Sequence, residues 1–119
     1  MDSILNSIKK QLGLGVEYEH FDPDIIIHIN TALSVLTQLG VGPSSGYMIT
    51  GPAEKWSDFM GKDPRLNCVV TYVYLKVKKI FDPTLSTAVK QAIDESIAEL
   101  EWRIHVTAED AMYNSNQHM

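Results

Sequence analysis

Cysteine is nearly absent from this sequence, and its scarcity limits how the fold can be held together. The 119 residues include one cysteine, Cys68, so an internal disulfide and a cysteine-based zinc cluster are both excluded. Val69 and Val70 follow it, which favours a small buried side chain over a reactive thiol. A chain of this length can bury roughly two thirds of its unfolded surface, so a single domain can fold without metal or disulfide.

Long apolar runs are also missing. No stretch of ~18 consecutive apolar residues occurs, and residues 1–12 lack the basic segment and continuous apolar core of a signal peptide. We therefore expect a soluble, unexported protein of a reducing cytosolic setting, with no membrane partner.

Positive charge is in short supply. Acidic residues outnumber basic residues by 15 to 10, and the formal net charge is −5. A field of this sign repels phosphate and disfavours nonspecific binding to nucleic acid. The stretch 94–110 is the most acidic, with Arg103 as its only basic residue. It is either a solvated face or a negative wall past which DNA slides without sticking.

Motifs of catalysis, cofactor binding and metal binding are absent as well. The sequence contains no HExxH, P-loop, GxGxxG or GxSxG. Its four histidines lack paired spacing, and His28 falls at the edge of an apolar stripe, where a boundary residue is typical. Adjacent acids such as Asp94 and Glu95 diverge on a helix. We predict no enzyme, no catalytic residue, no cofactor and no metal site.

What the sequence does contain is helical periodicity. The clearest helix begins at Asp22, read as its N-cap, with Pro23 at the first helical position, and ends at Gly40. A shorter helix over residues 3–12 is marginal alone, so we expect it to pack against the first. Trp56 and Phe59 indicate a single turn that docks two aromatic rings as a lid.

Two further helices follow. Asp63 and Pro64 repeat the start signal and open a helix that ends before Asp82 and Pro83. This helix is apolar on two sides, so it lies either at the centre of the domain or against another subunit. The last helix spans roughly residues 86–106 and has a narrow apolar seam: Val89, Ile93, Ile97, Leu100 and Ile104.

These elements predict an all-α fold, a small helical bundle of four to five helices. One domain covers residues 1–106, a loop projects around residues 41–53, and residues 107–119 form a flexible C-terminal tail. The loop is either a surface loop whose tip folds back on the core, or a segment that reaches a neighbouring subunit and pairs through its backbone.

More apolar residues are present than one small core needs, and self-association is the simplest use for them. An exposed tryptophan on a polar helix face, as Trp102 is predicted to be, is typical of residues that interfaces bury. The interface candidates are Ile27, Tyr47, Met48, Ile49, Tyr72, Leu75, Trp102, Met112 and Tyr113. A head-to-tail contact that closes on itself yields a ring.

The segment HINTALSVLTQLGVG, followed by a Gly-rich loop and WSDF, resembles the head–tail connector (adaptor) proteins of tailed bacteriophages, the siphophage neck proteins. Similarity continues through VYLKVKKIFDP and SIAELEWRI, up to about residue 106. The resemblance implies a dodecameric ring that binds the portal protein, extends the DNA channel without specific DNA binding, and receives a stopper or tail-completion protein. It also implies a virion location, assembly in the host cytoplasm, and docking through residues 107–119 and 47–49.

The alternative interpretation is a small helix-turn-helix DNA-binding regulator that dimerises through the seam of residues 86–106. Its best basic candidates, Arg65 and the lysines of residues 76–79, lie at opposite ends of one apolar helix. That spacing is poor geometry for reading a DNA groove.

Overall fold

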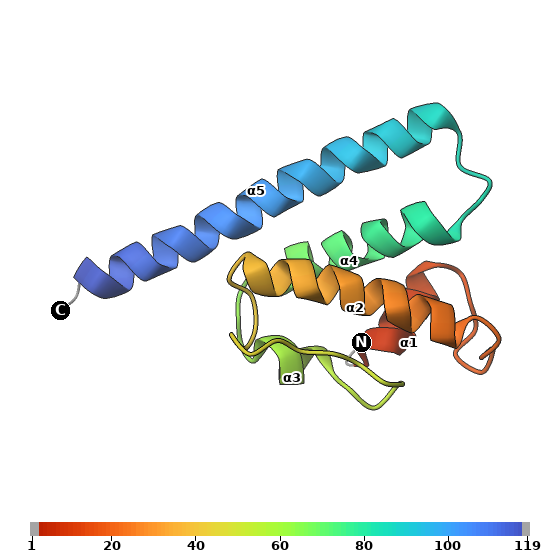
Figure 1. Cartoon of the computed structure of the whole chain (residues 1–119), viewed down its shortest axis with the longest axis horizontal. Helices are drawn as coiled ribbons and strands as arrows, with labels where there is room; N and C mark the ends of the chain where they lie inside the picture. Colours follow the sequence, from red (N-terminus) through yellow and green to blue (C-terminus); the bar gives the residue numbers. More distant parts are fainter. Residues whose placement is uncertain (1–2, 118–119) are drawn as a thin grey trace.

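The computed structural model describes the backbone of residues 3–117 and the side chains of residues 3–106. This part of the chain forms five helices and no strand, and its one β-bridge joins Ser3 to Lys55 (Figure 1). The helices are α1 (Ile4–Gln11), α2 (Asp22–Gln38), α3 (Trp56–Met60), α4 (Leu66–Phe81) and α5 (Thr87–Gln117). The predicted all-α bundle is confirmed.

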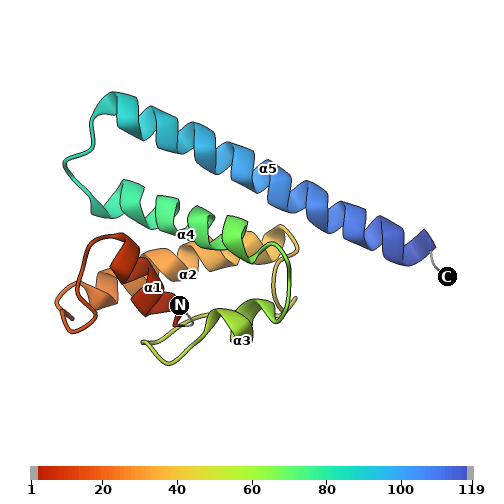
Figure 2. The same ribbon diagram turned by 180° about the vertical axis from the view of Figure 1, so that it is seen from behind.

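Helix α4 is the centre of the bundle. It packs against α2, α5 and α1, and it lies between α5 and α2 in Figures 1 and 2. Of the two positions expected for a helix that is apolar on two sides, the central one is found. Its buried side chains include Val69, Val73 and Val77. Each fully buried aliphatic side chain contributes about 1.5–3 kcal/mol of transfer free energy. The packing of α4 against its neighbours therefore stabilises the folded chain.

The short N-terminal helix is held as expected by packing against α2 and α4. Ser3 caps it, because its Oγ accepts a 3.2 Å hydrogen bond from the backbone N–H of Asn6. The aromatic lid is confirmed too. Trp56 and Phe59 of α3 are buried, and the indole N–H of Trp56 donates a 2.8 Å hydrogen bond to Ser7 Oγ on α1.

The expected N-cap role of Asp22 is wrong. Phe21 is the N-cap, and Asp22 lies inside the first turn of α2. Its Oδ1 is 2.9 Å from Nζ of Lys9, a fully buried lysine that also donates a 2.9 Å hydrogen bond to the carbonyl of Val16. A buried ammonium needs a compensating charge, so the carboxylate serves a contact between helices instead of a cap.

The second expected start signal is also displaced. Helix α4 begins at Leu66, after Asp63 and Pro64. Asp63 accepts from both the backbone N–H and the guanidinium of Arg65, each at 2.9 Å. Hydrogen bonding to Arg65 lowers the pKa of Asp63. The predicted end of α4 is confirmed, because the helix stops at Phe81, two residues before Pro83.

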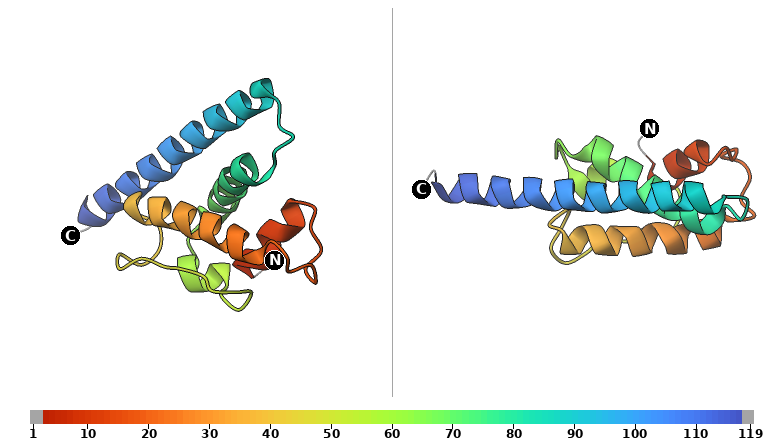
Figure 3. Two further views of the ribbon diagram at one scale, coloured as in Figure 1. Left: turned by 45° about the vertical axis from the view of Figure 1, so that its right-hand side comes forward. Right: turned by 90° about the horizontal axis from the view of Figure 1, so that it is seen from above.

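Helix α5 is longer than predicted. It continues past Val106 to Gln117 and extends beyond the other helices (Figure 3). Residues 107–117 contain no glycine or proline, and their alanine, glutamate and methionine residues favour helix. The helix therefore continues although this segment lacks a regular apolar spacing. In the predicted seam Ile93, Ile97 and Ile104 are buried and Leu100 is half-buried. Val89, the first residue of the predicted seam, is 43 % exposed.

Candidate interaction surfaces

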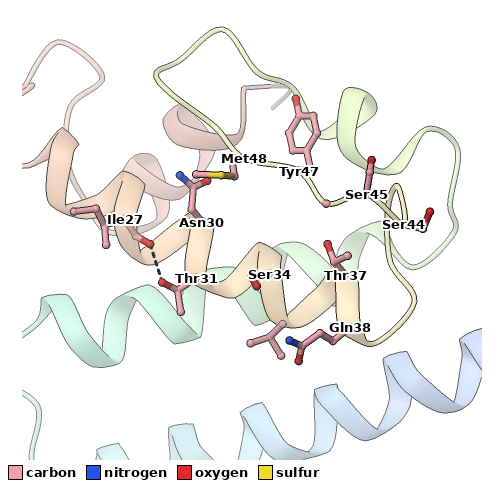
Figure 4. A pocket seen from close by; sticks show the side chains of 12 residues that line it. Ile27, Asn30, Thr31, Ser34, Thr37, Gln38, Ser44, Ser45, Tyr47 and Met48 are labelled. Carbon is pink, nitrogen blue, oxygen red and sulfur yellow. Dashed lines mark hydrogen bonds between the residues drawn. The ribbon is translucent and has the colours of Figure 1, made fainter.

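A groove runs between the outward face of α2 and the loop that follows it (Figure 4). From α2 it is lined by Ile27, Asn30, Thr31, Ser34, Thr37 and Gln38, among others. From the loop it is lined by residues 44–48, with Met48 towards the Asn30 end and Ser44 and Ser45 towards the Gln38 end. We call this surface the α2 groove.

One asparagine fixes the loop beside α2. The side-chain amide of Asn30 donates a 3.0 Å hydrogen bond to the carbonyl of Ile49 and accepts a 2.8 Å hydrogen bond from its N–H. Ile49 is fully buried beneath these contacts, which agrees with the expected alternative of a surface loop that folds back on the core. The Asn30 amide thus satisfies the N–H and the carbonyl of Ile49, as a neighbouring strand does in a sheet.

The residues after Ile49 are tied down by Glu54. Its carboxylate accepts from the N–H and the hydroxyl of Thr50, at 2.9 and 2.8 Å. These hydrogen bonds, led by the one from the Thr50 hydroxyl, lower the pKa of Glu54.

The start of the loop is fixed by packing. Gly42 has a φ of 75°, and a Cβ at this position would overlap the ring of Phe59. The ring of Tyr47 lies 5.5 Å from that of Phe59, centroid to centroid. Burial, with smaller contributions from the carboxylates of Asp58 and Glu54, raises the pKa of Tyr47. Both ends of the loop therefore rest on the core, and residues 43–46 form its tip.

The α2 groove lies within a stretch of the chain that carries no formal charge. Residues 25–53 contain no Asp, Glu, Lys or Arg. Two apolar side chains are nevertheless open to solvent here, Ile27 at 60 % and Met48 at 69 %. Depletion of charge together with exposed methionine and aromatic residues is typical of the core of a protein interface.

A further exposed apolar residue lies on α5. Trp102 is 66 % exposed, the largest side chain among the exposed hydrophobic residues described. Of the acidic residues on the described part of α5, Glu99 pairs with Arg103 at 2.8 Å and Asp94 pairs with Lys79. None of the described residues that line the α2 groove comes from α5.

Arg65 marks the point where α5 leaves the core. Its Nη1 donates a 3.2 Å hydrogen bond to the carbonyl of Ile104, and its Nη2 donates a 3.3 Å hydrogen bond to the carbonyl of Gly40. One guanidinium thus connects the start of α4, the end of α2 and the middle of α5.

The structure divides the nine interface candidates. Ile27, Met48 and Trp102 are exposed, whereas Tyr47 and Leu75 are half-buried against the core. Ile49 and Tyr72 are fully buried, so the expectation that Tyr72 is spare apolar surface is wrong. The side chains of Met112 and Tyr113 lie outside the described residues. The prediction missed the α2 groove as a unit, although the uncharged stretch 25–53 could have indicated it.

No chemical centre accompanies these surfaces in the part of the chain that is described. Within it, no three His, Cys, Asp or Glu side chains converge to hold a metal ion. None of its helices combines the length and apolar character needed to cross a membrane.

Comparison with known proteins gives one match. A family model described as "Phage connector protein" matches residues 4–111, from the start of α1 into the last turns of α5. No curated protein and no solved structure shows a significant match to the chain.

Proposed function

The chain belongs to the phage connector protein family, and we propose on this premise that it is a head–tail connector of the virion neck. Twelve copies form a ring beneath the portal protein, extend the DNA channel, and present a surface to a stopper or tail-completion protein. The subunits are made in the host cytoplasm and join the head there. The role is structural and involves no catalysis.

The observation that carries the proposal is the family match over residues 4–111, which includes α1 to α4 and most of α5. The distribution of apolar surface supports it. Ile27 and Met48 are exposed at the α2 groove and Trp102 is exposed on α5, so one subunit offers two different apolar surfaces. Contacts between unlike surfaces generate rings when the rotation closes, whereas like surfaces pair only into dimers.

The charge of the chain supports passage of DNA without specific binding. At a net charge of −5, a ring of many copies is strongly acidic, and phosphate contacts are disfavoured. Lys79, one of the few exposed bases on α4, is paired with Asp94.

The alternative of a DNA-binding regulator gains no support from the fold. It would need α4 as the recognition helix, but α4 is covered by α1, α2 and α5. The guanidinium of Arg65 is engaged by Asp63 and two backbone carbonyls. A shift of duplex DNA that weakens with added salt would revive the alternative.

The test is a pull-down of the full chain with the portal protein encoded beside it. We compare the intact chain with a chain truncated after Val106 and with Trp102→Ala. The truncation keeps the contact between Arg65 and Ile104, so the core should fold. Lys10→Ala, at an exposed position on α1, is the matched control.

Capture of the intact chain and of Lys10→Ala, with weaker capture of either other variant, is the expected result. An intact, folded chain that ignores both the purified portal and DNA-filled heads would contradict the proposal.

A further inference from the structure

We infer that the α2 groove of one subunit receives Trp102 from α5 of a second copy of this chain, and that this pairing is the repeating contact of the ring. The inference rests on the proposed function only for closure into a ring. The contact itself follows from the two surfaces.

The groove suits an indole ring. Ile27 and Met48 offer exposed apolar atoms, and the sulfur of a methionine makes favourable contacts with aromatic rings. Ser34 and Gln38 provide uncharged oxygens that can accept from the indole N–H, which needs a partner when it is buried. A tryptophan buries roughly 150–250 Å², more than any other side chain can place in such a site.

Charge disfavours one face that competes with the groove. Trp102 lies one turn from Glu99 and two turns from Glu95, on an exposed and acidic part of α5. Like charges that face each other across an interface are costly. The connection between α1 and α2, with the first turn of α2, carries Glu17, Glu19 and Asp24 and would repel this helix, whereas residues 25–53 carry no charge.

The length of α5 gives it the reach. At about 1.5 Å per residue, its 31 residues span about 46 Å, against about 26 Å for the 17 residues of α2. The longest dimension of the chain is 51 Å, so α5 alone crosses nearly all of it. The helix passes beyond the core after the contact of Ile104 with Arg65, close to Trp102 (Figure 3). Trp102 therefore lies near the point where α5 leaves the core, on the exposed side of the helix opposite the buried Ile104.

The α2 groove and Trp102 do not contact each other within one subunit, because no described residue of α5 lines the groove of its own chain. Each copy consequently has one donor surface and one acceptor surface. Such a contact is heterologous, and each added copy leaves a free groove at one end and a free tryptophan at the other until the ring closes.

Disulfide cross-linking tests the contact. In a Cys68→Ala background we combine Ser34→Cys in the groove with Ala98→Cys, which is exposed one turn before Trp102 on the same face of α5. Mild oxidation is applied to the purified chain at rising concentration and to the chain added to portal-bearing heads. The chain with both cysteines should give a ladder of covalent oligomers. An equimolar mixture of the two single-cysteine chains should give dimers and nothing larger.

Controls separate this contact from others. Adding Trp102→Ala to the double-cysteine chain should reduce cross-linking at least tenfold, while Lys10→Ala should leave it unchanged. Dimers from Ser34→Cys alone would mean that two grooves meet face to face, which overturns the inference. So would the absence of cross-links both in solution and on heads.

The outcomes also separate this inference from the proposed function. Heads that retain the chain without cross-links overturn the contact and leave the connector role intact. Cross-linked ladders from a chain that heads do not retain support the contact and count against the connector role.

Discussion

The hydroxyl of Tyr72 on α4 donates a 2.8 Å hydrogen bond to Glu101 Oε1 on α5. Burial, reinforced by the neighbouring carboxylate, raises the pKa of Tyr72 above its ordinary value of 10.0. The folded state therefore holds the phenol proton more tightly than the unfolded state does.

Tyr72→Phe should change how stability responds to alkali. A raised folded pKa gives a contribution that is fully present below pH 10 and is lost as pH rises towards the folded value. We expect the variant to lose about 1–2 kcal/mol at neutral pH and to show a flatter decline above pH 10. Urea denaturation at a series of pH values measures both effects. Tyr18→Phe, at a half-exposed residue, is the control, and equal slopes above pH 10 for wild type and Tyr72→Phe would contradict the prediction.

Arg65→Lys should destabilise the protein although it keeps the charge. An ammonium group cannot reproduce the planar fork that reaches Asp63, Ile104 and Gly40 at once. We expect a loss of about 2 kcal/mol, measured by thermal or chemical denaturation. Lys62→Ala, at an exposed residue, should stay within about 0.5 kcal/mol of wild type. A lysine variant as stable as wild type would show that the three-way contact is not formed.

Asp63→Asn should remove part of the sensitivity to acid. Because the folded pKa of Asp63 lies below its ordinary value of 3.8, its contribution is present above that pH and is lost as pH falls through the folded value. The variant should be less stable than wild type at pH 7, and the difference should shrink below pH 4. Denaturation curves between pH 7 and pH 2 test this, and a gap that stays constant with pH would exclude the mechanism.

The ion pair of Lys9 and Asp22 should respond unequally to removal of its two members. Lys9 is fully buried, whereas Asp22 keeps 19 % of its side-chain surface. Asp22→Asn leaves a buried ammonium without a counter-charge and should cost about 2–4 kcal/mol. Lys9→Met leaves a carboxylate whose Oδ1 is buried but whose side chain is partly open to water, so it should cost less. Chemical denaturation of both variants gives the order, and the reverse order would contradict the assignment of Lys9 as the buried partner.

Asn30→Ala should release the loop without unfolding the bundle. Both hydrogen bonds to the backbone of Ile49 are lost, at a cost of about 1–3 kcal/mol. Hydrogen exchange at the Ile49 amide should accelerate, while amides in the centre of α4 keep their protection. Thr31→Ala is the matched control, since Thr31 bonds only within its own helix, to the carbonyl of Ile27. Unchanged exchange at Ile49 would show that the loop is held by other contacts.

Periodicity predicted the helices because each buries one face. The second apolar face of α4 allowed two positions, at the centre of the domain or against another subunit, and the structure has the first. The helix starts were misassigned at Asp22 and Asp63. Asp22 pairs with buried Lys9, 13 residues earlier in the chain, and the sequence around Asp22 does not reveal this partner. Asp63 instead binds Arg65, only two residues later, so a local contact takes the carboxylate away from capping.

The interaction surfaces were predictable only in part, because exposure also depends on packing between elements. Trp102 stands among polar residues on its helix, so its exposure follows from pattern, whereas Met48 lies between Tyr47 and Ile49 and its exposure does not. Tyr72 looked equally misplaced, but the packing of α5 on α4 covers it and supplies Glu101 for its hydroxyl. Ile49 looked like part of a mobile tip until Asn30 was placed beside it. The sequence pattern predicts on which face of its own helix a residue lies. It does not predict which other element covers that face.

The loop after α2 is fixed to the core at both ends, so its tip can change without disturbing them. Gly42 is held against Phe59, and Ile49 is held by Asn30, so neither end depends on what lies between them. Residues 43–45 of the tip are exposed, and lengthening a surface loop adds only about 0.6 kcal/mol for each doubling of its length. Residues 43–46 are therefore where this chain can accept insertions, tags or new sequence during evolution while the bundle beneath stays unchanged.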